Sequence, residues 1–172
     1  MIFIKNKERR RMLTRCLLEG FYFTVSAGLS FLVLWWFLPL WLSCMLLSVV
    51  MVHEMGHYLT AAYHGYDVWL PFFVAIVVGV IGGTYVATDD PEERIKFQLA
   101  GPLAGGLACA AWGAAALISG FPPAVFAALW SLLSQILTAI VGGDGRKHRR
   151  YKRVIAEARA GWEAGQGSTI PA

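Results

Sequence analysis

Residues 40–63 read LWLSCMLLSVVMVHEMGHYLTAAY and place two histidines and a glutamate inside a strongly apolar segment. A helix that crosses the hydrocarbon core of a bilayer needs about 20 apolar residues, and this segment is long enough. Ionisable side chains are unfavourable within a membrane and usually have a function there. The segment therefore predicts a membrane-spanning helix with a functional site at His53, Glu54 and His57.

The chain as a whole has the composition of a membrane protein. Of its 172 residues, 57% are hydrophobic, and its mean hydropathy of +0.55 is too high for an ordinary soluble domain. We expect an all-α integral membrane protein formed by a single domain over residues 1–172. Four segments are long and apolar enough to span the bilayer, at about 17–38, 40–63, 97–119 and 122–142.

Two further segments do not fit a spanning helix. Residues 69–86 are apolar but few, and Pro71 and three glycines interrupt them. We expect a short re-entrant segment or a β-hairpin within the membrane, covered by protein because non-helical backbone survives at that depth only when it is shielded from lipid. After the last span, residues 145–172 predict a flexible, basic C-terminal tail.

The distribution of Lys and Arg predicts the orientation of the chain. Basic residues cluster before the first span and after the last, whereas the expected outer turns near Pro39 and Gly120 carry none. By the positive-inside rule both termini are cytoplasmic, and the number of spans is even. We expect a multi-pass protein in the cytoplasmic membrane of a bacterium or archaeon. The basic run at 146–153 satisfies this orientation rule, which favours the lipid bilayer over nucleic acid as its partner.

The histidines and the glutamate have the spacing of a zinc site. His53 and His57 lie four residues apart, so they project from one face of a helix and can hold one zinc ion. Zinc lowers the pKa of a bound water to about 7, and Glu54 would take the proton from that water as a general base. The alternative is a pair of helix histidines that bond to neighbouring groups, which is less favoured within a membrane.

A hydrolytic zinc site usually has a third protein ligand. His64 lies roughly 10 Å farther along a straight helix, too far to share the ion. Asp144 directly follows the last apolar run, in IVGGDGRK. With both termini inside, the second and fourth spans run in the same direction, so Asp144 and the two histidines come out at the same side of the bilayer. The alternative for Asp144 is a turn residue beside glycines.

Three segments, in order, resemble the site-2 proteases, a family of intramembrane zinc metalloproteases. They are VHEMGHYLTAAYHG, QLAGPLAGG and GGDGRK, within residues 40–147. The resemblance implies that His53, His57 and Asp144 hold zinc and that Glu54 is catalytic. Many members carry an Asn and a Pro shortly before the Asp-Gly pair. In this chain the Pro is missing, and Gln135 lies near the position of the Asn. The residue that positions the substrate therefore stays open.

The resemblance also implies a reaction, in a minimal form without a PDZ or nucleotide-binding regulatory domain. The enzyme would hydrolyse a peptide bond within or next to a transmembrane segment of a membrane-protein substrate, near the cytoplasmic face. That segment must first unwind, and residues 69–86 could then pair with it as an exposed sheet edge does. The alternatives are an inactive membrane adaptor of the same fold that binds transmembrane segments, a zinc peptidase with a glutamate as third ligand, and a metal transporter. The oligomeric state stays open.

Overall fold

The computed structural model describes residues 2–76, 79–84, 86–87, 97–140 and 143–167. Within these ranges, four helices are long and apolar enough to cross a membrane, which confirms the expected helical membrane protein. The corresponding segments are Leu13–Phe37 within α1 (Ile2–Phe37), α2 (Leu40–Tyr63), α4 (Ala100–Ser119) and α5 (Pro122–Ile140).

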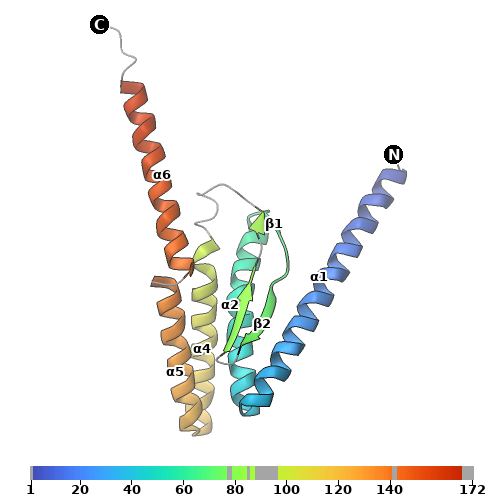
Figure 1. Cartoon of the computed structure of the whole chain (residues 1–172), viewed down its shortest axis with the longest axis vertical. Helices are drawn as coiled ribbons and strands as arrows, with labels where there is room; N and C mark the ends of the chain where they lie inside the picture. The colour runs from blue at the N-terminus through green and yellow to red at the C-terminus, as the bar shows by residue number, and fades with distance from the viewer. Residues whose placement is uncertain (1, 77–78, 85, 88–96, 141–142, 168–172) are drawn as a thin grey trace.

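The four helices run alternately down and up in Figure 1. α2 packs against α4, and α4 packs against α5, whereas α1 is splayed away from this group and makes more contacts with the strands than with α2. Both ends of the chain point toward the same end of the molecule (Figure 1). A chain with an even number of spans begins and ends on the same side of the membrane. Which side that is stays a prediction.

Glycines end two of the helices at the expected places. After α2, Gly65 adopts a φ of 78°, a left-handed conformation that glycine reaches without a steric penalty. The N–H of Tyr66 then donates to the carbonyl of Ala61 and closes the helix end. After α4, Gly120 has a φ of 64° and serves the same role. Each glycine lets the chain turn out of its helix.

Two antiparallel strand pairs lie between α2 and α4 in the chain. β2 (Phe72–Ile76) pairs with β3 (Gly79–Gly83), with Val74 opposite Ile81. β1 (Asp67–Val68) pairs with β4 (Val86–Ala87). This segment therefore contains β-strands and is not a simple loop. Its β-branched residues favour that conformation. Its depth in the membrane stays a prediction.

The strands are held between α1 and α2. β2 contacts α1, where the N–H of Phe73 donates to the hydroxyl of Ser26 at 3.2 Å. Nearby, the Arg15 guanidinium lies 2.6 Å from the carboxylate of Asp67 in β1. On the other side, β3 contacts α2. Protein thus covers the strand pair on two sides, as non-helical backbone near a membrane requires.

The ends of the last spans and the tail differ from the sequence-based expectation. α4 begins at Ala100 and not at 97, because a turn at Leu99 precedes it. α5 is described as far as Ile140, and residues 141–142, where the expected span ends, lie outside the described residues. The segment expected to be a flexible tail is a helix, α6 (Gly143–Gly167). It is rich in Arg, Lys, Glu and Ala, which have high helix propensity, and that propensity outweighs the polarity on which the expectation depended.

Candidate active site

The three residues of the zinc motif lie together on α2 and are buried. His53, Glu54 and His57 expose only 8%, 7% and 8% of their surfaces. The two imidazole rings have their centroids 5.0 Å apart. The helical spacing therefore brings both rings to one side of α2, in its C-terminal half.

The orientation of His57 is fixed by a backbone carbonyl. Its Nδ1 lies 2.7 Å from the carbonyl oxygen of Phe97, three residues before α4. A carbonyl oxygen can only accept a hydrogen bond, so Nδ1 carries the proton. In the neutral ring the lone pair then lies on Nε2, which is the atom that would coordinate a metal.

His53 has an equivalent partner on a different helix. Its Nδ1 lies 2.6 Å from Oε1 of Gln135, a buried residue of α5. The amide oxygen is an acceptor, so this ring also has its proton on Nδ1 and its lone pair on Nε2. Histidines that bind metal usually donate their second ring N–H to an oxygen in this way. The described donor set therefore fits a zinc ion at the two Nε2 atoms.

Glu54 faces the strands. The hydroxyl of Thr84 donates to its Oε2 at 2.8 Å. A Cβ atom added to Gly82 of β3 would overlap the Glu54 side chain, so only glycine leaves room for this carboxylate. The strand pair thus forms a wall that holds Glu54 in place beside the histidines.

Glycines of α4 form the opposite wall. A Cβ on Gly101 would overlap the ring of His57, and one on Gly105 would lie 2.5 Å from Oε1 of Gln135. α4 therefore approaches the site closely at these two glycines. Gly106, by contrast, has room for a methyl group, because the nearest atom belongs to Leu132 at 3.7 Å.

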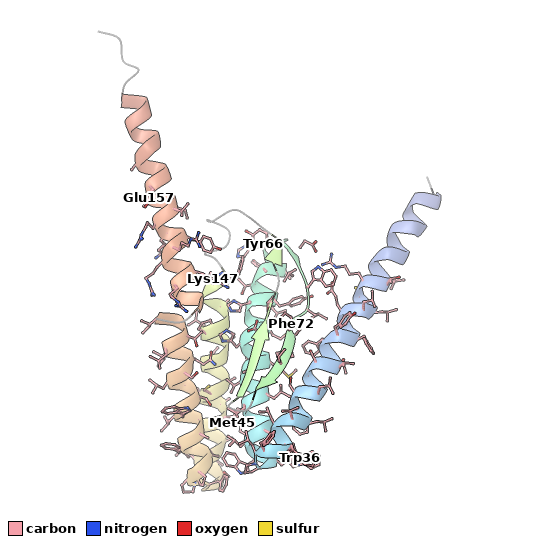
Figure 2. The ribbon with its side chains drawn as sticks, viewed as in Figure 1. Trp36, Met45, Tyr66, Phe72, Lys147 and Glu157 are labelled. Carbon is pink, nitrogen blue, oxygen red and sulfur yellow. The ribbon has the colours of Figure 1, made fainter. Side chains whose placement is uncertain are left out.

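A cavity of about 150 Å³ opens beside these residues. Its lining comes from α2, from β3 and the residue after it, from the two residues at 97–98 that precede α4, and from α6. The lining residues are Glu54, His57, Gly82, Gly83, Thr84, Phe97, Gln98 and Lys147. Lys147 lies at the end of α6 nearest the spans (Figure 2). Its place in the lining brings the first turns of α6 to the cavity.

The third predicted ligand cannot be followed to its side chain. Asp144 is the second residue of α6, and its side chain lies outside the described part of the chain. Among the described side chains, no group of three His, Cys, Asp or Glu residues is placed to hold a metal. His64 is exposed just after α2 and lies against the ring of Tyr63, with centroids 5.4 Å apart.

Four residues around the site had no assigned role in the sequence. Thr84, Phe97, Gln98 and Lys147 surround the cavity, yet none belongs to the HExxH spacing. Gln135 was noted only as an amide near a position that family members use. Its contact with His53 joins residues 82 positions apart, which periodicity does not reveal.

No protein-family model matches this chain, and no curated protein or solved structure matches it either.

Proposed function

We propose that this protein is an intramembrane zinc metalloprotease of the site-2 protease type. It hydrolyses a peptide bond within or next to a transmembrane segment of a membrane-protein substrate, near the cytoplasmic face. One zinc ion is held by His53, His57 and Asp144, and Glu54 is the general base.

The arrangement of the two imidazoles is the observation that carries this proposal. Both rings have Nδ1 against an oxygen, at 2.6 and 2.7 Å, and both are buried. Two histidines that only pack between helices need not have the same tautomer. Here both rings carry the proton on Nδ1 and the lone pair on Nε2, which supports metal binding.

The third ligand is assigned from position in the helix. Asp144 and Lys147 are three residues apart in α6, and residues at that spacing lie on the same face of a helix. Because Lys147 lines the cavity, a third ligand from α6 is expected on the face that Lys147 shares. This supports Asp144 over the exposed carboxylate of Glu157, which projects from α6 farther along (Figure 2).

The chain's own residues supply the proton transfers. When bound, zinc would polarise the substrate carbonyl and lower the pKa of its water to about 7. Thr84 hydrogen-bonds Oε2 of Glu54, which orients Oε1 to accept the proton of the attacking water. Glu54 then passes this proton to the leaving amine. The unwound substrate segment would lie along β3, beside Glu54 and the cavity.

A cleavage assay in liposomes tests the proposal. The probes are a panel of tagged single-span proteins, each with a Gly-Pro pair that weakens its span, and mass spectrometry locates any product. We expect cleavage within the span by the zinc-loaded protein and none by Glu54→Gln, which keeps its zinc. Glu157→Gln is the matched control and should cleave normally, because Glu157 is exposed on α6.

Two outcomes would count against the enzyme. Cleavage by Glu54→Gln at the normal rate would contradict the role of Glu54 as the general base. Binding of the spans without any cleavage would favour the inactive adaptor.

A further inference from the structure

Gln98 is a buried polar residue whose amide oxygen has no partner within the described part of the chain. It exposes 7% of its surface, and its Oε1 is fully buried without a hydrogen bond to any described residue. A buried acceptor left unpaired destabilises a protein by about 1–3 kcal/mol, so nearly all such groups are paired. An oxygen left in this state points to a partner that arrives from outside the chain.

The position of Gln98 brings its side chain to the candidate active site. Gln98 lines the same cavity as Glu54 and His57. Its neighbour Phe97 provides the carbonyl that orients His57. Two adjacent residues just before α4 therefore contact the site: Phe97 fixes a predicted zinc ligand, and Gln98 brings an acceptor to the cavity.

The cavity needs an acceptor that is not already in use. A substrate segment that has unwound exposes main-chain N–H groups, which have lost their helical partners and need new ones away from water. Lys147 offers only donors. Glu54 accepts from Thr84 and is assigned to the water. The Thr84 hydroxyl is already held by its bond to Glu54. Among the described side chains of the cavity, Gln98 carries the buried acceptor that has no partner.

We propose that Gln98 Oε1 accepts a hydrogen bond from a main-chain N–H of the substrate, next to the bond that is cleaved. Gln98 is thus a substrate-binding residue that holds the extended peptide in place over Glu54. This inference rests on the proposed protease function, and it assigns a role to a side chain that is not part of the predicted zinc site.

Hydroxamate binding to the zinc-loaded protein in detergent tests this inference. The three probes are acetohydroxamic acid, a leucyl-leucine hydroxamate, and the same peptide hydroxamate with its main-chain nitrogens methylated. They are titrated against the unmodified protein and Gln98→Met, which has a similar length and no strong acceptor. We expect methylation to weaken binding to the unmodified protein about tenfold, and to Gln98→Met by less than about threefold.

The three probes separate the two proposals. Acetohydroxamic acid has no peptide N–H, so it should bind both proteins equally and shows that Gln98→Met keeps the site intact. If it fails to bind the unmodified protein, the zinc site is wrong and the role of Gln98 falls with it. If it binds, but methylation has the same effect on both proteins or no effect on the unmodified one, only the role of Gln98 is overturned. If methylation has no effect on the unmodified protein, the role of Gln98 is overturned even if Gln98→Met does not fold.

Discussion

Gln135 of α5 and His53 of α2 are joined by a hydrogen bond of 2.6 Å between Oε1 and Nδ1, across 82 positions of the chain. This contact connects the helix that carries the zinc motif to the helix that precedes Asp144. It also selects the tautomer of His53, because the amide oxygen accepts the proton of Nδ1.

Replacement of Gln135 by Leu should weaken zinc binding. Loss of a group that orients a metal-binding histidine typically lowers affinity by about 10–100-fold. Gln135→Glu keeps an acceptor at this position and should recover most of the affinity. Ser134→Ala, at an exposed neighbour, is the control. Competition with a zinc chelator measures all three. Equal affinities for Gln135→Leu and Ser134→Ala would show that the contact does not serve the metal.

Replacement of Thr84 by Val should slow cleavage and leave zinc content unchanged. The valine keeps the shape of the side chain and removes the hydroxyl that donates to Glu54. A hydrogen bond to a charged group contributes about 1.5–3 kcal/mol, so kcat should fall at least about tenfold while KM changes little. Thr84→Ser restores the hydroxyl and should restore the rate. An unchanged kcat in Thr84→Val would mean that the hydroxyl does not orient the base.

Replacement of Gly101 by Ala should disturb His57 and reduce zinc content. The added methyl would overlap the imidazole ring, and the ring is held on its other side by the Phe97 carbonyl. Gly28→Ala in α1 is the matched control, because a Cβ there meets nothing within 4 Å. Both variants are compared by zinc content and by thermal unfolding in detergent. Normal zinc content in Gly101→Ala would show that the wall formed by α4 is less rigid than described.

Hydropathy and motif spacing were enough to predict the four spans and the position of His53, Glu54 and His57. They did not predict α6, because the polar, basic composition of the segment indicated a tail, whereas its Arg, Lys, Glu and Ala residues favour a helix. They also did not identify Thr84 or Gln98. Both reach the site only because β3 and the residues just before α4 pack near α2, and a single sequence does not show which elements pack together.

The orientation of the chain follows from the positive-inside rule and can be measured directly. A reporter fused after Gly120 should be external. One inserted near Glu92, which lies outside the described residues, should be cytoplasmic. The paired reporters are compared in intact cells. An external reporter near Glu92 would contradict the prediction that the two histidines and Asp144 lie at the same side of the membrane.

Zinc content of the purified protein is the most direct test of the metal site. The account predicts one zinc ion per chain in the unmodified protein and a large loss in His53→Ala and in Asp144→Asn. Asp144→Asn keeps the turn propensity of the residue and removes its charge, so it separates a ligand from a turn residue. Asp67→Asn, the same change at an exposed residue of β1, should keep its zinc. Elemental analysis of the four proteins after dialysis gives the answer. One zinc in the unmodified protein and none in His53→Ala and Asp144→Asn is the predicted result, whereas equal zinc content in all four proteins would contradict the site.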